Sequence, residues 1–491
     1  LSCVSTEGAL KNLQAEAAGV DFETLAARAG EKWNKELSVI EARGSHDELC
    51  MLYTSLYHTM ISPSVYMDVD GQYRGVDHMI HQAEGFTNYT VFSLWDTYRA
   101  LHPLFNVINR ERNRDMVMSM LEHYRQSVHK ALPVWSHMGN ENWCMIAYHG
   151  VAVVADAVAK GIELDTALVL EAMKNSSNIP YYQHTREYVE KGYVPVDKDG
   201  NGASITLENA YDDWAIYRTA KAAGNENMAH EYESRAMNYR NLFDERLGFA
   251  RPRLSDGSWK EPFDPLGTHG EGFIEGNSWN YSLHVPHDVN GLIRLTGGEK
   301  RFAERLDSLF TMHLPEKYYA DTEDITEEGL MGNYVHGNEP SHHVLYLYAW
   351  TSQPWKTQFR VREVMNRMYR NKIDGLCGND DCGQMSAWYI FSALGFYPVC
   401  PGTDQYVLGA PYLPYMKIRL ENGNTFEVRA SKVDDKNRYV KAVRLNGKPY
   451  DKAYITQRDI MAGGMLEFEM SNRPNRNRIY TDDNKPYSLT R

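Results

Sequence analysis

The stretch 374–389 combines residues that could do chemistry with an apolar segment that could position them. Its first half places carboxylates and an amide among glycines and cysteines, a composition typical of a tight loop. Its second half, Gly383–Leu394, is apolar and aromatic and is followed by a glycine, which is typical of a buried helix. The pattern predicts a loop that places Asn379, Asp380 and Asp381 beside the free N–H groups of a helix N-terminus.

The same residues also fit a structural role. Asp381 could cap the helix, with Gln384 at the third position as in a capping box. Cys377 and Cys382 are close enough to suggest a metal pair, but no second pair supports a zinc site, so we interpret them as ordinary loop and core residues. The local pattern leaves Asp381 as either a cap or a functional carboxylate.

A second acidic, glycine-bearing loop occurs at 271–281. It places Glu275 next to a glycine and Asn277, and Trp279 follows. A carboxylate beside an aromatic ring can have its pKa raised by desolvation, which a general acid requires. Glu275 is therefore a candidate proton donor.

A third loop of this kind occurs at 335–343. Asn338 and Glu339 offer oxygen atoms, which are hard ligands that suit calcium. His342 and His343 could bind a transition metal, but adjacent positions on a helix point apart. If the three loops meet at one end of a helical ring, two carboxylates could hydrolyse a glycosidic bond while other oxygens hold a cation.

The apolar run 92–104 contains Asp96 and Arg99 beside Trp95. Helical spacing puts Asp96 and Arg99 on one face. The two side chains could form a structural ion pair or bind hydroxyl groups in a cleft, and the local pattern does not decide between these roles.

Length and composition restrict the class of protein. The chain has 491 residues, of which 43% are hydrophobic, so it can build a substantial core. A net charge of −13 argues against nucleic acid as the natural partner. The 33 Tyr and 10 Trp pair flat apolar faces with polar handles, which suits a sugar, although core packing explains most of them. No apolar run reaches the ~18 residues that a membrane helix needs.

Hydrophobic periodicity predicts a mainly helical chain. The expected helices are Phe22–Arg43, Glu48–Met60, Asp115–His129, Ala147–Lys160, Asp165–Lys174, Thr206–Ala223, Asn227–Leu242, His287–Leu295, Arg301–Phe310, His342–Trp350, Pro354–Tyr369 and Gln384–Leu394. Buried and amphipathic helices follow one another in hairpins, which favours a toroid whose inner ring is covered by an outer one.

After about residue 400 the sequence pattern changes from helical periodicity to short β-type runs. Short β-type runs are expected at Tyr406–Gly409, Tyr415–Leu420, Thr425–Ala430, Tyr439–Leu445 and Met465–Met470. Asn-Gly and Gly-Gly pairs between them are typical of hairpin turns. We expect a small antiparallel β region at this end of the chain.

The motifs also resemble a known family. The stretches 92–104, 275–288, 336–343 and 378–402 resemble the signature motifs of family 92 glycoside hydrolases, and so does 207–214. The matches occur in the family's order over residues 1–420. That family is known for calcium-dependent, inverting exo-α-mannosidases, with a β-sandwich followed by an (α/α)6 toroid.

The resemblance implies a division of the chain. Residues 1–20 would be the end of the sandwich and a linker, with Leu1–Val4 as its last strand. Residues 21–400 would form the catalytic (α/α)6 toroid, and 401–491 the C-terminal β region. The chain begins without an initiator Met or a signal sequence, so we expect most of the sandwich and any export signal to lie upstream.

The resemblance also implies roles for single residues. Glu275 would be the general acid and Asp381 the base that activates water. Position 379 is aspartate in many family members and Asn379 here, which makes Asp381 the clearer base. Asn338 and Glu339 would help hold Ca²⁺. Asp96 would bind mannose hydroxyls, and the rest of the site would be formed by Trp95, Arg99, Asn277, Trp279, Asn379 and Asp380.

The expected activity is hydrolysis, with inversion, of terminal α-mannosyl residues from N-glycans or mannans. By the same resemblance, we expect an enzyme exported to the periplasm or the exterior of a bacterium. The alternatives are another toroidal carbohydrate-active enzyme, a catalytically silent glycan-binding protein and a helical scaffold. A phosphorylase would need a basic glycine loop for phosphate, which the sequence does not offer, and a scaffold does not explain three acidic loops of matching chemistry.

Overall fold

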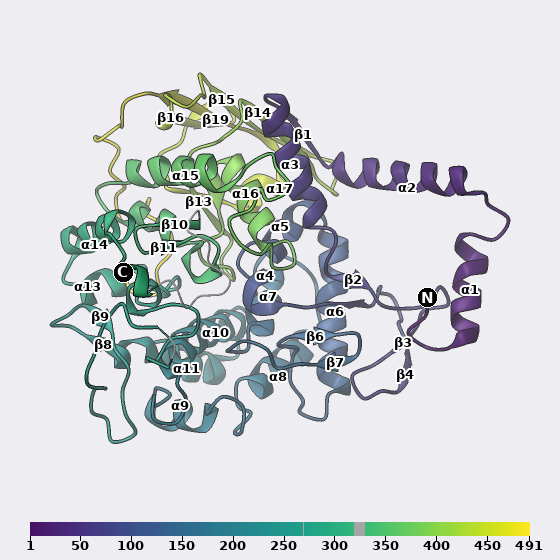
Figure 1. The fold of residues 1–491 in the computed structure, drawn as a ribbon, viewed down its shortest axis with the longest axis horizontal. Helices are drawn as coiled ribbons and strands as arrows, with labels where there is room; N and C mark the ends of the chain where they lie inside the picture. Colours follow the sequence, from purple (N-terminus) through teal and green to yellow (C-terminus); the bar gives the residue numbers. More distant parts are fainter. Residues whose placement is uncertain (269, 319–328) are drawn as a thin grey trace.

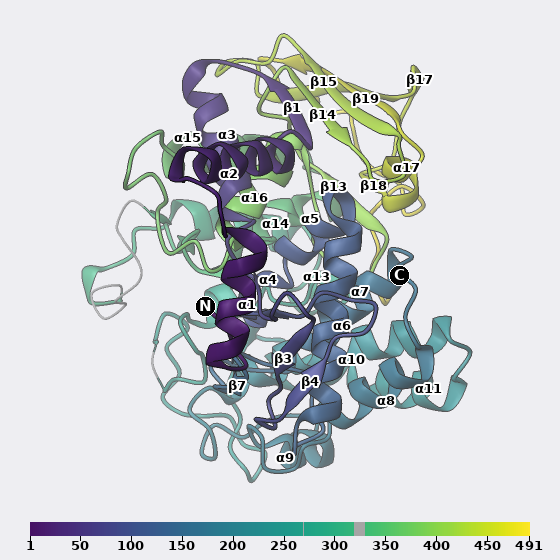
Figure 2. The same cartoon turned by 90° about the vertical axis from the view of Figure 1, so that its right-hand side faces the viewer.

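The computed structural model describes residues 1–268, 270–318 and 329–491. It consists of a helical body with a sheet at one end, and an N-terminal pair of helices stands to one side (Figures 1 and 2). The predicted combination of a helix-rich body and a C-terminal β region is confirmed.

Amphipathic helices alternate along the chain with almost wholly buried segments. The amphipathic ones are α3 (His46–His58), α6 (Arg110–Gln126), α8 (Thr166–Ser176), α11 (Glu226–Arg235), α14 (Glu299–Thr311) and α15 (Trp355–Met368). The buried ones are α5 (Leu101–Ile108), α7 (Gly150–Ala159), α10 (Gly202–Ala222), α13 (Val289–Leu295), the 3₁₀ segment η5 (Val344–Trp350) and α16 (Gln384–Leu394).

The buried segments form the inner layer of a ring. Helix α16 contacts α5, α5 contacts α7, α7 contacts α10, and α13 contacts η5. The amphipathic helices cover them from outside, since α6 packs on α5 and α7, α11 on α10, and α15 on η5. This arrangement is the predicted (α/α)6 toroid. The segment expected as a helix at 342–350 is a 3₁₀ helix of slightly smaller extent.

Short helices and hairpins connect the ring helices. The helices are α4 (Leu94–Thr97), α9 (Thr185–Lys191), η1 (Asn238–Leu242), α12 (Ser278–Tyr281), η2 (Glu316–Tyr318), η4 (Glu339–Ser341) and α17 (Gln457–Met461). The hairpins pair β2 (Ser64–Val65) with β5 (Tyr89–Thr90), β3 (Gln72–Arg74) with β4 (Ile80–Gln82), β6 (Ser136–His137) with β7 (Asn140–Glu141), β8 (Phe243–Asp244) with β9 (Phe249–Ala250), and β10 (Leu330–Met331) with β11 (Tyr334–Val335).

The C-terminal region contains the strands that the sequence predicts. A sheet of order β1-β14-β15-β19-β16-β17 joins β14 (Tyr415–Arg419), β15 (Thr425–Ser431), β16 (Tyr439–Leu445), β17 (Lys448–Pro449) and β19 (Gly464–Ser471). Its pairs are antiparallel except for β15 with β19, which is parallel. A smaller sheet joins β12 (Phe396–Tyr397), β13 (Gln405–Leu408) and β18 (Tyr454–Thr456).

The first strand of the large sheet comes from the other end of the chain. The helix expected over 22–43 ends at Leu37 as α2 (Phe22–Leu37), and β1 (Ile40–Arg43) then pairs with β14. Ile40 is fully buried, so this edge strand is anchored by its side chain as well as by its backbone. The expectation of one helix over 22–43 was wrong because its last residues find hydrogen-bond partners far along the chain.

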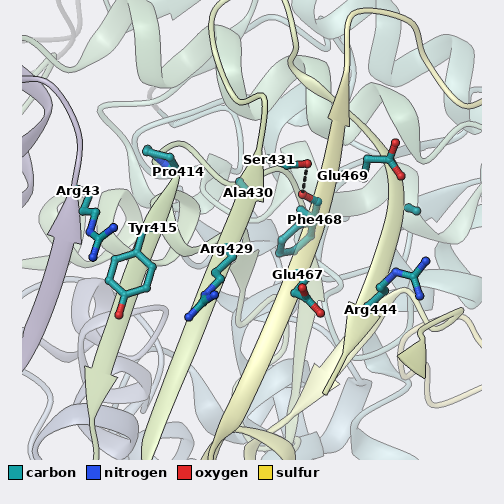
Figure 3. Close-up of a pocket in the computed structure, with 11 residues that line it drawn as sticks. Arg43, Pro414, Tyr415, Arg429, Ala430, Ser431, Arg444, Glu467, Phe468 and Glu469 are labelled. Carbon is teal, nitrogen blue, oxygen red and sulfur yellow. Dashed lines mark hydrogen bonds between the residues drawn. The ribbon is translucent and has the colours of Figure 1, made fainter. Parts of the chain in front are cut away.

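A row of side chains crosses the outer face of this sheet (Figure 3). Cross-strand pairing places Arg43, Tyr415, Arg429, Glu467 and Arg444 next to one another in that order. The Arg43 guanidinium lies 4.8 Å from the centre of the Tyr415 ring. Such cation–π contacts and opposite charges on neighbouring strands stabilise an exposed sheet face.

The N-terminal segment differs in part from expectation. Leu1–Val4 form no strand in the structure, and α1 (Thr6–Glu16), which the sequence analysis did not predict, begins directly after Ser5. Asn12 of this helix donates a hydrogen bond to Asp68 at 2.9 Å. A sandwich strand at Leu1–Val4 would need neighbouring strands from outside this sequence, so that assignment and the domain limits at 20 and 400 stay predictions.

The start of α16 depends on Asp380. Its Oδ1 accepts hydrogen bonds from the Ser386 backbone N–H at 3.1 Å and from the Ser386 hydroxyl at 2.6 Å. Gln384 bonds to another helix instead, because its Oε1 accepts from the Ala100 N–H at 2.9 Å. The capping box expected at Asp381 is therefore wrong, and the carboxylate one residue earlier caps the helix.

Gly383 provides a test of how this helix is joined to its loop. It has φ +93°, and a Cβ there would lie 2.8 Å from the Thr59 Cα. We expect Gly383→Ala to lower the free energy of unfolding by about 2–5 kcal/mol, since backbone strain and steric overlap add. Chemical denaturation measures this loss.

Gly224→Ala is the matched control. Gly224 has a similar φ of +74°, but among the described residues none beyond its own chain neighbours comes within 4 Å of the position of its Cβ. It should lose only about 1–2 kcal/mol from backbone strain. Equal losses in the two variants would show that the close approach at Gly383 does not matter.

Candidate functional site

Two short connecting helices and one loop bring three carboxylates together. Asp96 lies on α4, Glu339 begins η4, and Asp381 lies in the loop before α16. One carboxylate oxygen from each lies within 4.8 Å of the other two. Asp96 and Glu339 are each only 2% exposed. This group, called here the acidic cluster, unites residues to which the sequence analysis had given different roles.

Glu275 is connected to the acidic cluster through Asn338, which precedes the cluster residue Glu339 in the sequence. Asn338 Nδ2 donates a hydrogen bond to Glu275 Oε2 at 2.8 Å. The next residue, Glu339, shares the acidic cluster with Asp381. The pair Asn338–Glu339 therefore joins the predicted general acid to the predicted base. Glu275 itself is exposed, as a proton donor that meets substrate must be.

The backbone is unusual at both predicted catalytic residues. Glu275 has φ +48° and Asp381 has φ +47°, in the left-handed region that residues with a Cβ rarely adopt. Such conformations cost about 1–3 kcal/mol each and persist only where the surrounding structure fixes them. Here both occur in acidic loops that lead into helices, α12 after Glu275 and α16 after Asp381.

The electrostatics of the acidic cluster favour a bound cation. Burial raises the pKa of Asp96 and Glu339 well above the usual carboxyl range, and nearby Asp381 raises both further. Glu339 Oε1 is buried and has no hydrogen-bond partner among the described residues. Three carboxylates with an unused oxygen form an all-oxygen donor set, which fits a hard divalent cation. Asp96, expected on the sugar, thus lies among the candidate metal ligands.

Trp95 and Arg99, expected in the wall of the site, are held from behind by Glu208 of α10. Trp95 Nε1 donates to Glu208 Oε1 at 3.0 Å, and Arg99 Nη2 lies 3.5 Å from Glu208 Oε2. Arg99 also stacks on the ring of Tyr98 at 4.6 Å. Its ion pair is therefore with Glu208, and not with Asp96 as helical spacing had allowed.

Sequence reasoning did not assign a role to Glu208, although the stretch 207–214 was singled out. The signal available was a run of acidic residues within an otherwise buried helix. Burial alone would raise the pKa of Glu208, but its cationic and hydrogen-bonding neighbours lower it to about 2. Glu208 is therefore ionised at neutral pH.

The loop before α12 uses two expected site residues for packing. Asn277 caps α12, accepting from the Trp279 N–H at 3.0 Å, and its side chain pairs with Asn333. The Trp279 ring contacts Phe249 at 4.9 Å between ring centres and lies under Arg305. These contacts show how the loop that carries Glu275 is held.

Asn379 and Asp380 line a different hollow. The cavity, of about 480 Å³, lies between α3 and residues 369–376. Asp380 caps α16 there, as described above, and Asn379 is exposed. The structure therefore separates Asp380 from the acidic cluster, and among the acidic residues of this loop the cluster takes in Asp381.

The neighbouring histidines of the third loop serve the fold. His342 Nε2 is paired with the His336 carbonyl at 2.9 Å, and His343 Nε2 with the Leu283 carbonyl at 2.8 Å. Burial lowers the pKa of His342 to about 3 and that of His343 to about 4, so both are neutral. They point to different partners, as expected for adjacent positions.

Within the described ranges, no helix is both long enough and apolar enough to span a membrane.

Comparison with known proteins identifies relatives for nearly the whole chain. Residues 8–472 match the model of the glycosyl hydrolase family 92 catalytic domain. A solved family GH92 α-mannosidase from Bacteroides thetaiotaomicron is 45% identical with a TM-score of 0.94, over 99% of this chain and 64% of that one. A family GH92 inverting mannosidase from Bacteroides thetaiotaomicron VPI-5482 is 34% identical with a TM-score of 0.92, over 100% of this chain and 68% of that one.

A curated relative comes from a fungus. It is described as an uncharacterized secreted glycosidase of Arthroderma benhamiae and is 26% identical over 96% of this chain. The chain spans 60% of that relative and 64% of the α-mannosidase above. The family match covers the acidic cluster, Glu275 and the ring that positions them, and the chain belongs to glycosyl hydrolase family 92.

Proposed function

We propose that this chain hydrolyses terminal α-mannosyl residues of glycans, with inversion and with the help of calcium. One observation carries the proposal: Asn338 and Glu339 join Glu275 to the acidic cluster. The named activities of the relatives support it, and one solved GH92 α-mannosidase, 44% identical, is a complex with mannoimidazole. The substrates we expect are mannose-containing glycans of the N-glycan or mannan type.

Glu275 is proposed as the general acid. Breaking the glycosidic bond leaves negative charge on the departing oxygen, and a proton delivered there relieves it. Oε2 of Glu275 accepts from Asn338, so a proton on this carboxyl is held on Oε1. In this proposal Oε1 is the oxygen of Glu275 that delivers the proton to the leaving group.

Asp381 is proposed as the general base. An ionised carboxylate can take a proton from water as that water attacks the sugar carbon. Inversion needs room for the water, which corresponds to ~6.5–9.5 Å between the two catalytic carboxyls. The left-handed backbone at Asp381 and its place in the acidic cluster support this role.

The remaining donors of the site suit a calcium ion. Asp96 and Glu339 of the acidic cluster would hold it through carboxylate oxygens, and Asn338, whose amide nitrogen is engaged with Glu275, would add its amide oxygen. Calcium bound there would supply a Lewis-acid contact to neighbouring sugar hydroxyls, and the axial 2-hydroxyl of mannose offers a bite that glucose lacks. Asp96 then contributes to mannose recognition through the ion.

We further propose that the enzyme works outside the cytoplasm, in the periplasm or the exterior of a bacterium. The description of the fungal relative as secreted supports export, and the mannosidases from Bacteroides thetaiotaomicron support a bacterial source. The alternative of a silent glycan-binding protein keeps the fold and the acidic cluster but predicts sugar binding without turnover.

Removing the metal should abolish activity. Dialysis against a chelator should stop mannoside hydrolysis, and calcium should restore it better than zinc, because the donor set is all oxygen. Release of mannose from α-linked mannobioses measures this. Full activity after exhaustive chelation would contradict the calcium assignment.

Stability without metal should depend on pH in a defined direction. A carboxyl whose pKa is higher in the folded than in the unfolded protein stabilises the fold at low pH, and this contribution is lost as pH rises through the folded value. Asp96 and Glu339 have such raised pKa values. In chelator, the melting temperature should therefore fall from pH 5 to pH 8, and calcium should raise it more at pH 8.

Glu339→Gln is the control for that measurement. It keeps the shape of the side chain and removes one of the two raised titrations. Its melting temperature in chelator should fall less between pH 5 and pH 8 than that of the wild type. Parallel profiles of melting temperature against pH in the variant and the wild type would contradict the raised pKa of Glu339.

The loss of hydrolysis rate should depend on the substrate when Glu275 is replaced, and should not depend on it when Asp381 is replaced. Glu275→Gln should slow hydrolysis of a mannobiose by ~10²–10⁴-fold and that of an activated aryl mannoside far less, because a good leaving group needs no proton. Asp381→Asn should slow both substrates alike, since each needs an activated water.

Turnover and calcium affinity together decide the role of Asp381, which lies in the acidic cluster. If Asp381 is the base, Asp381→Asn should lose turnover and keep near-normal calcium affinity. If Asp381 is only a metal ligand, the variant should bind calcium more weakly, and excess calcium should restore its turnover. Normal turnover by folded Asp381→Asn at ordinary calcium concentration would remove it from the mechanism.

A further inference from the structure

Glu208 is the centre of a buried network directly behind the candidate site. Its side chain is fully buried on α10. It contacts Trp95, which precedes Asp96 on α4, through the indole N–H at 3.0 Å, and Arg99, which lies just after α4, through the guanidinium at 3.5 Å. It also accepts hydrogen bonds at 2.6 Å and 3.2 Å from His149 Nε2 and Tyr281 Oη.

The network is balanced in charge. His149 Nδ1 lies 2.9 Å from Asp212 Oδ1, so the ring lies between two carboxylates, those of Asp212 and Glu208. Burial alone would lower the pKa of His149, but Asp212 and Glu208 raise it to about 9, so the ring is a cation. Two anions, Glu208 and Asp212, therefore face two cations, His149 and Arg99.

Arg99 lies between this network and the acidic cluster. Its Nη2 and Glu339 Oε1 are both buried and without a hydrogen-bond partner in the part of the chain that the structure describes. Both residues line the same small cavity, together with His284 and His342. The Arg99 charge also acts on Asp96 and Glu339, whose pKa values it lowers against the larger effect of burial. Arg99 could thus pair with either side.

We propose that Glu208 is a positioning residue that keeps Arg99 away from the cation site. With Glu208 in place, the guanidinium is neutralised by α10, and the carboxylates of Asp96 and Glu339 remain available for a metal ion. Without that carboxylate, Arg99 becomes the nearest counter-charge for the acidic cluster and competes with calcium. The inference rests on the proposed calcium site and assigns Glu208 no contact with substrate.

The test is calcium affinity, measured by titration calorimetry on metal-free protein. Glu208→Gln keeps the shape and removes the charge, and should weaken calcium binding by about 10–100-fold, the range found when partners of metal ligands are removed. Arg99→Met removes the competing cation and should not weaken calcium binding. The double variant Glu208→Gln/Arg99→Met should recover most of the calcium affinity that Glu208→Gln loses. Because it removes both members of the Glu208–Arg99 ion pair, it leaves neither charge buried without the other and should be less destabilised than Glu208→Gln.

Asp213→Asn is the matched control. Asp213 is also fully buried on α10 and bonds to Tyr148, Tyr188 and Arg235, at 2.8, 2.7 and 3.0 Å. Its loss should lower the melting temperature and leave calcium affinity unchanged.

Three results would overturn the inference. They are normal calcium affinity in Glu208→Gln, an equal loss in Asp213→Asn, or weaker binding in Arg99→Met and in the double variant. If Glu208→Gln does not fold, calcium affinity is compared in Arg99→Met and in Glu208→Gln/Arg99→Met. Weaker binding in both of these variants than in the wild type would then overturn the inference. A wild-type chain that neither binds calcium nor cleaves mannosides would overturn the proposed function as well, whereas a wild type that does both isolates the failure to Glu208.

Discussion

Negative charge is concentrated in the interior of the ring, where buried carboxylates of several segments lie close to one another. Carboxylates that meet in a buried space cannot all be ionised unless cations or hydrogen-bond donors compensate them. Around Glu208, Asp212 and Asp213 the chain supplies its own compensation, through Arg99, His149 and Arg235. At the acidic cluster the Ser93 hydroxyl donates to Asp96 and the Arg99 charge lowers the pKa of Asp96 and Glu339, but burial still raises both pKa values, and the three carboxylates together could hold a cation.

The inner layer of the ring explains how such a site can be held in place. Every residue of α16 is buried, and α10 is buried along most of its length, so neither segment can shift without losing packing on all sides. The loops between these segments inherit that rigidity. This is why the left-handed backbone at Glu275 and Asp381, which would relax in a free loop, can be maintained.

Much of the fold was readable from the sequence because the relevant signals are local. The bounds of α16 follow from an apolar run between Gly383 and Gly395, and β16 from alternating residues before an Asn-Gly turn. The strand Ile40–Arg43 was missed because its partner β14 lies at the opposite end of the chain, and nothing in its own residues announces that pairing. Helix α1 was missed because it is mostly polar and buries only Gly8.

The site was predictable as a set of loops and not as a set of contacts. Loop composition and family resemblance selected Glu275, Glu339, Asp96 and Asp381; the structure groups the last three and joins Glu275 to Asn338, while their roles stay predictions. Two contacts differ from expectation. Asp380 and not Asp381 accepts from the first turn of α16, because of the backbone geometry of the loop. Arg99 pairs with Glu208 and not with Asp96, because α10 packs against it from elsewhere in the chain. Spacing along one helix shows which side chains share a face, but it does not show which neighbour that face meets.

The pairing of β1 with β14 has a consequence for how the chain is made. A strand near the beginning of this sequence waits for a partner near its end, and the tail is also tied back, since the Thr490 N–H donates to Asp288. At ~5–20 residues per second, a ribosome needs on the order of tens of seconds to deliver that partner. Until then β1 has no strand to pair with, and the Ile40 side chain, which is fully buried in the finished fold, has no sheet to pack into.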